Sequence, residues 1–199
     1  MTPFTVVTSR LVPMPAANVD TDQIIPAQHV NLQGRDALAH ALFVNLRNEY
    51  PDFVLNRPDM QGRTVLLVGP NFGCGSSREA AAWALGAAGF RALIGTSFND
   101  TFWNNCTRNG ILPLALPVDV HARVCAIVSE TPDVEVTIDL PANRLALAGA
   151  TIEFTPRDHF VRDLMIGGID ELDYLLGRRD AIGAYEAAHR SPGIPPPDR

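Results

Sequence analysis

Short, unbroken apolar runs in the middle of the chain predict strands that are buried on both faces. These runs lie at residues 64–68, 91–95 and 111–116. Alanine-rich or amphipathic stretches predict helices at residues 80–89, 97–109 and 118–130. A strand, a helix and a second strand in this order form a βαβ unit. Residues 64–95 are therefore expected to contain two parallel strands joined by a right-handed crossover.

The pattern changes after residue 133. Apolar and polar residues alternate at 134–140 and again at 144–148, which predicts a β-hairpin with one face in solvent. A further strand is expected at 150–154, and a looser alternation at 4–12 predicts a first strand near the amino end. The antiparallel hairpin should therefore follow the parallel centre of an α/β fold.

Helical spacing elsewhere predicts three more helices, one at residues 36–47 and two within 157–188 that are separated at Gly167-Gly168. Asp36 and Ser97 are the expected N-caps of the helices at 36–47 and 97–109. Four residues of the helix at 97–109 recur at helical spacing and are expected in the core: Phe98, Phe102, Trp103 and Cys106.

Composition excludes several classes of function. The 199 residues carry a formal net charge of −6, which argues against nucleic acid or an anionic membrane as the main partner. No run of 18 apolar residues predicts a membrane span. The length suits one domain, expected over residues 1–190. The proline-rich stretch 191–199 is expected to be a disordered tail.

The cysteines and histidines do not predict a metal site on this chain. Cys74, Cys106 and Cys125 lack the close Cys-x-x-Cys spacing that iron–sulfur clusters usually use, although distant cysteines sometimes join a cluster. The five histidines form no His-x-x-x-His pair. No secretory signal begins the chain, so we expect reduced thiols in a cytoplasmic protein.

The stretch 69–79 joins the carboxyl end of the predicted strand at 64–68 to the amino end of the helix that follows. Ser76 and Glu79 have the spacing of a capping box, which by itself predicts only a helix start. Gly73 and Gly75 would allow a tight turn, and Arg78 offers two parallel hydrogen bonds to a carboxylate. Such a turn suits an anion.

The anion is expected to be a carboxylate. A nucleotide phosphate loop requires a lysine after its last glycine, but all sixteen basic residues of this chain are arginine. The same composition excludes a lysine Schiff base. The sequence therefore predicts a carboxylate-binding turn and leaves its chemistry open.

The same turn resembles a known signature. Asn71-Phe72-Gly73-Cys74-Gly75-Ser76-Ser77-Arg78-Glu79 is similar to the motif of the small subunits of 3-isopropylmalate dehydratase, a family related to aconitase. Further similar stretches follow in the family's order, at residues 18–26, 97–106, 109–113 and 180–186. The resemblance extends from about residue 5 to about residue 188. It implies a swivelling β/β/α domain like the carboxyl-terminal domain of aconitase.

The resemblance also implies a reaction and roles for named residues. The reaction would convert 2-isopropylmalate to 3-isopropylmalate by dehydration and rehydration in leucine biosynthesis, with a separate large subunit that carries a [4Fe–4S] cluster. Ser76 would be the catalytic base. The substrate, a small dicarboxylate, would be bound by Ser77, Arg78 and Arg35. Asp22 would support the site, together with Gly73 and Gly75.

Two departures from the family pattern keep other functions open. The residues around Arg35 differ from the usual substrate loop, so a related dehydratase that acts on another 2-substituted malate or on citraconate is one alternative. Ala80 stands where the family usually has a histidine. A non-catalytic regulatory subunit is therefore the second alternative. Arg35 could also be only a solvated loop residue.

Overall fold

The computed structural model describes residues 1–75 and 78–189. Ser76, Ser77 and the predicted tail 191–199 lie outside these described residues. The described strands form one seven-stranded sheet in the order β4-β3-β2-β1-β5-β6-β7. Their bounds are β1 Val6–Met14, β2 Val65–Val68, β3 Ala92–Gly95, β4 Leu112–Ala115, β5 Glu135–Asp139, β6 Arg144–Leu147 and β7 Ala150–Glu153.

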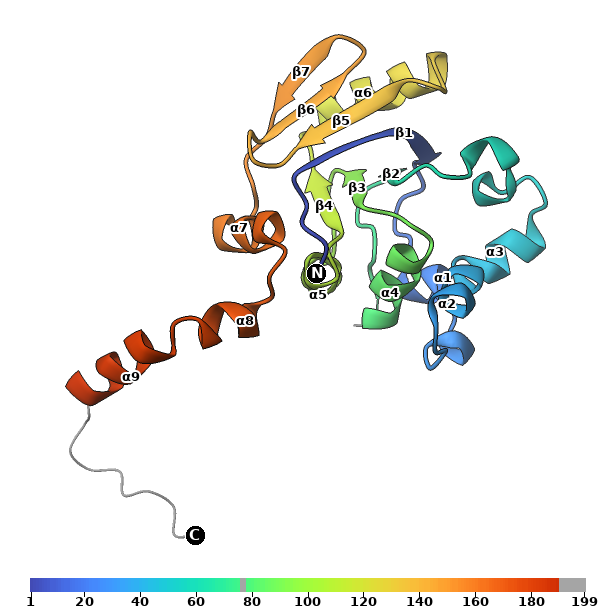
Figure 1. The fold of residues 1–199 in the computed structure, drawn as a ribbon. Helices are drawn as coiled ribbons and strands as arrows, with labels where there is room; N and C mark the ends of the chain where they lie inside the picture. Colours follow the sequence, from blue (N-terminus) through green and yellow to red (C-terminus); the bar gives the residue numbers. More distant parts are fainter. Residues whose placement is uncertain (76–77, 190–199) are drawn as a thin grey trace.

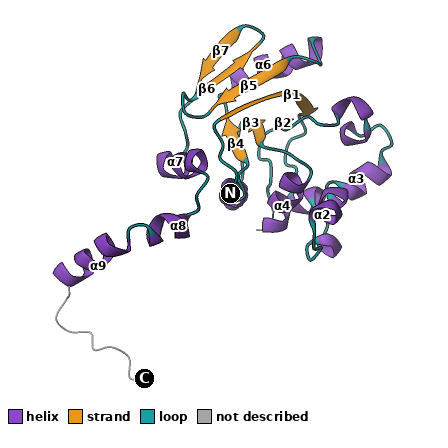
Figure 2. Cartoon of the chain, in the orientation of Figure 1, coloured by secondary structure: helices purple, strands orange, loops and turns teal. Residues whose placement is uncertain are grey.

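The sheet has a parallel half and an antiparallel half (Figures 1 and 2). Strands β1 to β4 pair in parallel, which confirms the βαβ unit at 64–95. Strands β5, β6 and β7 pair antiparallel in sequence order, and only alternate residues of β5 and β6 are buried. The predicted hairpin with one solvated face is therefore confirmed.

Strand β1 joins the two halves by changing partners. Its residues 6–10 pair with β5, whereas residues 11–14 pair with β2. The strand continues through Pro13, beyond its predicted end at residue 12. The carbonyl oxygen of Leu11 points away from β2 and accepts a hydrogen bond from Arg63. The nitrogen of Pro13, two residues later, points to the same side, because backbone groups alternate along a strand. Pairing with β5 has already ended there, so the N–H that proline lacks removes no hydrogen bond from the sheet.

Helices cover both faces of the parallel half. The α-helices are α1 Thr21–Ile24, α2 Arg35–Ala41, α3 Val44–Glu49, α4 Glu79–Ala87, α5 Asp100–Arg108, α6 Val118–Glu130, α7 His159–Gly167, α8 Glu171–Leu176 and α9 Arg179–Ala188. Three 3₁₀ turns occupy Ala27–His29, Val54–Asn56 and Pro58–Met60. Helices α1 to α5 contribute to the apolar core on one face of the sheet, and α6 and α7 to the core on the other. Among the described residues, no helix has the length and apolar composition needed to cross a bilayer.

Three helix predictions need correction. The helix expected at 36–47 is two helices, because the chain turns at Leu42 and Phe43 to bury both side chains; the amide of Phe43 donates to the carbonyl oxygen of Ile24 at 2.8 Å. Gly34, not Asp36, occupies the N-cap position of α2. Residues 157–188 contain three helices, since the chain breaks at Gly177 as well as at Gly168.

The N-cap predicted at Ser97 is also wrong. Asn99 caps α5, and its side-chain oxygen accepts hydrogen bonds from the amides of Thr101 and Phe102. Ser97 lies before the helix and has another role in the site described below. The four core residues predicted for this segment are confirmed, since Phe98, Phe102, Trp103 and Cys106 are all buried.

Arg63 connects the two halves of the sheet. Its side chain is 4% exposed and donates to the carbonyl oxygens of Leu11 at 2.7 Å, Pro132 at 2.8 Å and Asp59 at 3.0 Å. Its second terminal nitrogen pairs with the Asp133 carboxylate at 2.9 Å. The guanidinium therefore satisfies backbone acceptors where β1 leaves β5.

Arg63→Ala is expected to lower the free energy of unfolding by about 3 kcal/mol, because one buried and two partly buried carbonyl oxygens lose their donor. Urea denaturation measures this. Arg10→Ala is the matched control, since Arg10 pairs with the same Asp133 at 3.4 Å but is 52% exposed; its cost should stay below about 0.5 kcal/mol. Equal losses for the two variants would show that the buried arginine has no special role.

Candidate functional site

The candidate site lies where the parallel strands end at their carboxyl edge. Strands β1, β2 and β3 end at Met14, Val68 and Gly95. The segments that follow them are residues 18–22, the glycine loop 69–78 and residues 97–99. In an open α/β sheet, this edge is where ligands usually bind. We call the meeting point of these three segments the carboxyl-edge corner.

Backbone hydrogen bonds hold the first segment against the glycine loop. The amide of Gly73 donates to the carbonyl oxygen of Val19 at 2.8 Å, and the amide of Thr21 donates to that of Cys74 at 3.0 Å. The side chain of Asn71 adds a bond to Asn18 at 2.8 Å. Residues 18–22 therefore follow the glycine loop closely along its described part.

The third segment fixes the other side of the glycine loop. The Ser97 hydroxyl accepts a hydrogen bond from the amide of Asn71 at 2.8 Å, and the carbonyl oxygen of Ser97 accepts one from Phe72 at 3.2 Å. The amide of Asn99 then donates to Phe72 at 3.3 Å. Ser97 thus holds the loop instead of capping a helix.

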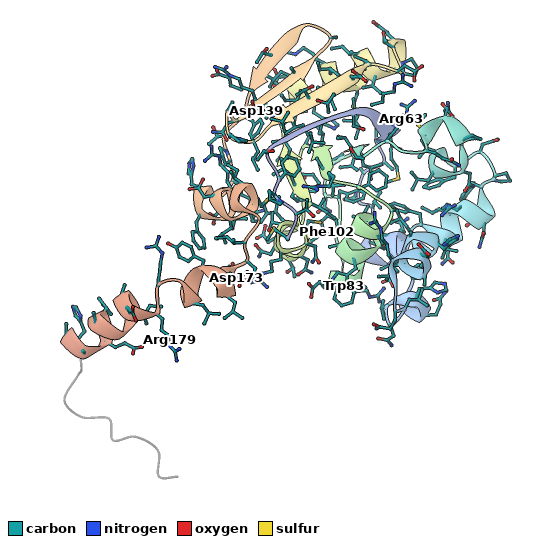
Figure 3. All side chains as sticks on the ribbon, viewed as in Figure 1. Arg63, Trp83, Phe102, Asp139, Asp173 and Arg179 are labelled. Atoms are coloured by element: carbon teal, nitrogen blue, oxygen red, sulfur yellow. The ribbon has the colours of Figure 1, made fainter. Side chains whose placement is uncertain are left out.

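Gly73 must be a glycine for two independent reasons. Its φ is +74°, in the left-handed region that side chains disfavour. A Cβ at this position would also lie 2.2 Å from Cγ of Phe102, a residue of α5 that is 2% exposed and is labelled near the middle of the molecule in Figure 3. The loop therefore rests directly on this buried ring.

Arg78 and Asp22 form the charged centre of the corner. A terminal nitrogen of Arg78 donates to a carboxylate oxygen of Asp22. Asp22 lies on α1, whose start is fixed by a capping box between Asp20 and Gln23. The Arg78 side chain is 24% exposed. An arginine has five N–H donors, so Arg78 can be oriented by Asp22 and still bind an incoming carboxylate.

The start of α4 differs in part from the predicted capping box. The helix begins at Glu79, and Arg78 occupies the N-cap position without a side-chain cap. The Glu79 carboxylate accepts a hydrogen bond from the side chain of Asn109 at 3.1 Å. Ser76 and Ser77, the predicted base and one predicted substrate ligand, lie outside the described residues, between Gly75 and Arg78.

Arg35 is not brought together with Arg78. Its Nε donates to the carbonyl oxygen of Ala87 at 3.1 Å, at the carboxyl end of α4. Arg78 precedes the amino end of the same helix, and nine helical residues span roughly 12 Å. In this structure Arg35 therefore stabilises the end of α4. Of the predicted site residues that are described, Asp22, Gly73, Gly75 and Arg78 lie in or beside the corner.

The described residues do not fit an iron–sulfur cluster. No group of three or more His, Cys, Asp or Glu side chains among them could hold a metal ion. Cys106 is fully buried, and burial raises the pKa of its thiol well above the ordinary value. A thiol that resists ionisation is a poor metal ligand, because the thiolate is the form that binds.

Sequence reasoning missed the residues that shape the corner from outside the glycine motif. Asn18 and Asn71 both have positive φ, at 56°, and bond to each other. Asparagine is among the few residues that tolerate this conformation. The spacing of Asp20 and Gln23 is a capping-box spacing and could have predicted α1. The role of Ser97 depends on a contact between distant segments, for which no local signal exists.

Comparison with known proteins agrees with this geometry. Residues 1–119 match the family model described as the aconitase C-terminal domain. A 3-isopropylmalate dehydratase small subunit of Solibacter usitatus is 47% identical over 193 residues, covering 96% of this chain and 97% of that one. One of Roseiflexus castenholzii is 43% identical over 194 residues, covering 95% of each chain.

A solved structure is also similar. The crystal structure of 3-isopropylmalate dehydratase from Methanocaldococcus jannaschii matches with a TM-score of 0.65 and 27% identity, covering 91% of this chain and 99% of that one. The predicted aconitase-type α/β fold is confirmed by this structure and by the family model. On the family model and the extent of these identities, the chain belongs to the aconitase-related family of 3-isopropylmalate dehydratase small subunits.

Proposed function

We propose that this chain supplies half of the active site of an enzyme that isomerises 2-isopropylmalate to 3-isopropylmalate in leucine biosynthesis. A large subunit would supply the other half, in the cytoplasm. The observation that carries the proposal is the Asp22–Arg78 pair at the amino end of α4. Asp22 orients the guanidinium of Arg78, and in the sequence the two serines of the family motif come directly before Arg78.

The first chemical problem is to hold a doubly charged substrate. The Arg78 guanidinium would bind one carboxylate through two parallel hydrogen bonds, while Asp22 keeps its plane fixed. Ser77 would donate a further hydrogen bond. The amino end of α4 adds positive potential at the same place. The whole chain carries a formal net charge of −6, but these contacts would make the potential at the corner locally positive. A local positive potential is sufficient to bind a small anion.

The second problem is to remove a proton from a carbon next to a carboxylate. Ser76 would take this proton as an alkoxide. A free serine is far too weakly acidic for this step, so the alkoxide needs positive surroundings. Arg78, two positions further along, and the amino end of α4 would supply them. On rehydration, Ser76 would deliver the proton to the carbon that lost the hydroxyl, while the hydroxyl adds to the carbon that lost the proton, which gives the isomer.

We place the [4Fe–4S] cluster on the large subunit, because the described residues of this chain do not fit one. Bound there, the cluster would supply Lewis-acid chemistry at the substrate hydroxyl. The chain described here would then contribute the base and the carboxylate contacts.

The function is tested by mixing the purified chain with the large subunit from the same organism. We expect conversion of 2-isopropylmalate, with transient absorbance of an alkylmaleate, only in the mixture. Because Arg35 lies at the far end of α4 from Arg78, a panel of other 2-substituted malates and citraconate should be included. A complex that assembles but turns over none of these substrates would support a regulatory subunit instead.

Arg78→Lys is expected to lower kcat/KM about 100-fold, because lysine keeps the charge but cannot form the paired hydrogen bonds. Steady-state kinetics on the assembled enzyme measures this. Arg57→Lys is the matched control, since Arg57 forms an exposed pair with Asp59 at 2.8 Å and should leave kcat/KM unchanged. Equal kinetics for the two variants would contradict a role for Arg78 in holding the substrate.

Arg35→Ala is expected to raise KM at least about tenfold, if its side chain leaves α4 to bind substrate as the family resemblance implies. The control measurement is the unfolding free energy of the same variant. A KM equal to that of the wild type, with stability lower by about 0.5–1 kcal/mol, would show that Arg35 only stabilises the end of α4.

A further inference from the structure

The last two helices form an arm that stands away from the sheet. We define the C-terminal arm as residues 169–189, which contain α8 and α9. Figures 1 and 2 show it extending from α7 away from the strands, and Figure 3 labels Asp173 and Arg179 on it. Neither helix has a buried residue. Within the arm, only Tyr174 is even partly buried.

Helix α8 contacts the body through Tyr174 and Glu171. The ring of Tyr174 packs edge-on against Phe160 of α7, with ring centroids 4.8 Å apart. Glu171 pairs with Arg108 of α5 at 3.4 Å. These contacts orient the helix, so the opposite side has a defined direction into solvent.

That opposite side is apolar. Leu172 and Leu176 lie two positions before and after Tyr174, which places them across the helix from it. Leu172, Leu175 and Leu176 are 63%, 51% and 58% exposed. Helix α9 continues the pattern with Ile182 and Tyr185, three positions apart on one face and 40% and 65% exposed. We call these five side chains the arm patch.

Helices as short as α8 and α9 need a surface to pack on. They have six and ten residues, and isolated helices shorter than about 12 residues are marginal in water. Most helical stability in proteins comes from burying an amphipathic face. Here the large apolar side chains of both helices are exposed instead of buried. Five such side chains on two consecutive short helices are more than the single apolar residues of an ordinary surface, and they indicate an interaction site.

The relatives indicate what covers the patch. A small subunit of Anaeromyxobacter dehalogenans aligns over 196 residues, with 96% of this chain and 100% of that one covered. At most 4% of the 199 residues, about eight, lie outside this match. Most of the arm therefore lies within the aligned region. The aligned relative is named a small subunit, a name that implies a large-subunit partner.

We propose that the arm patch docks the chain onto the large subunit. This inference rests on the proposed function, and it names the surface through which the partner is held. Binding would bury the five side chains and let α8 and α9 pack against a second surface. The arm patch lies outside the carboxyl-edge corner, so docking through the arm would not cover Arg78 itself, and the large subunit could present its half of the active site at the corner.

The test compares the affinity of variants of the full chain for the large subunit, measured by calorimetry. The first variant combines Leu172→Ser, Leu175→Ser and Leu176→Ser, and the second combines Ile182→Ser and Tyr185→Ser. The control combines Arg179→Ser and Glu186→Ser, two exposed polar residues of α9. We expect Kd to rise at least 30-fold for the first variant and about tenfold for the second. The control should stay within about twofold.

Loss of the fold does not explain such a result, since the five side chains are exposed in the isolated chain and its melting temperature should not change. Wild-type affinity in both patch variants would overturn the inference and leave the proposed function intact. The inference would also be overturned if the wild-type chain forms a dimer on its own and the first variant is a monomer. A second copy of the chain would then cover the patch. An assembly that depends on the patch but does not act on isopropylmalate would instead overturn the proposed function.

Discussion

Ser76→Ala is expected to lower kcat of the assembled enzyme by roughly 10³ to 10⁴-fold. A positioned general base contributes about 10² to 10⁴-fold, and alanine leaves no group at this position that could accept the proton. KM should change little, because the carboxylate contacts of Arg78 remain. Steady-state kinetics with 2-isopropylmalate measures both constants, and gel filtration checks that the variant still assembles with the large subunit.

The neighbouring serine provides the control for this prediction. Ser77→Ala removes a proposed substrate contact but no base, so its main effect should be on KM, by about tenfold. A wild-type kcat for Ser76→Ala would refute the assignment of the base. A larger loss of kcat for Ser77→Ala than for Ser76→Ala would transfer the role to Ser77.

Gly73→Ala is expected to lower the free energy of unfolding by about 2–5 kcal/mol. The left-handed φ of +74° costs about 1–2 kcal/mol for a residue with a Cβ. The new methyl group would also lie 2.2 Å from the Phe102 ring, and displacing a buried ring costs about a further 1–3 kcal/mol. Chemical denaturation measures the loss.

Gly62→Ala separates these two causes. Gly62 has a nearly identical φ of +77°, but no atom lies within 4 Å of the position of an added Cβ. This variant should lose only the conformational cost, about 1–2 kcal/mol. If Gly73→Ala is no more destabilising than Gly62→Ala, the loop does not rest on Phe102 as described. Any activity loss in Gly73→Ala would then need another explanation.

The parallel centre of the fold could be predicted because its strands are covered on both faces. Residues 65–68 are all buried, so the sequence there is an unbroken apolar run that local patterns identify. The hairpin was predictable for the opposite reason, since only alternate residues of β5 and β6 are buried. Features fixed by contacts between distant segments were not predictable. Phe43 breaks a helical pattern in order to bond Ile24, and Arg63 looks like any surface arginine in the sequence.

In the site, too, local motifs were predictable from the sequence and contacts between distant segments were not. The glycine motif and its family resemblance pointed to Arg78 and Asp22, and these two side chains meet in the structure. Arg35 was placed in the site by resemblance alone, and its hydrogen bond to Ala87 could not be inferred from residues 31–37. The arm patch was not predicted either. Apolar residues at helical spacing normally face a core, and only the structure shows that these face solvent.

A crystal structure of the assembled two-subunit enzyme with a bound dicarboxylate substrate analogue would show directly whether this chain forms half of the active site. We expect the analogue to lie between the subunits at the carboxyl-edge corner. One carboxylate should be bound by Arg78 through two hydrogen bonds, and the Ser76 hydroxyl should lie within about 3.5 Å of the carbon that loses its proton. An analogue bound entirely by the large subunit, with Arg78 and Ser76 beyond contact distance, would contradict this expectation.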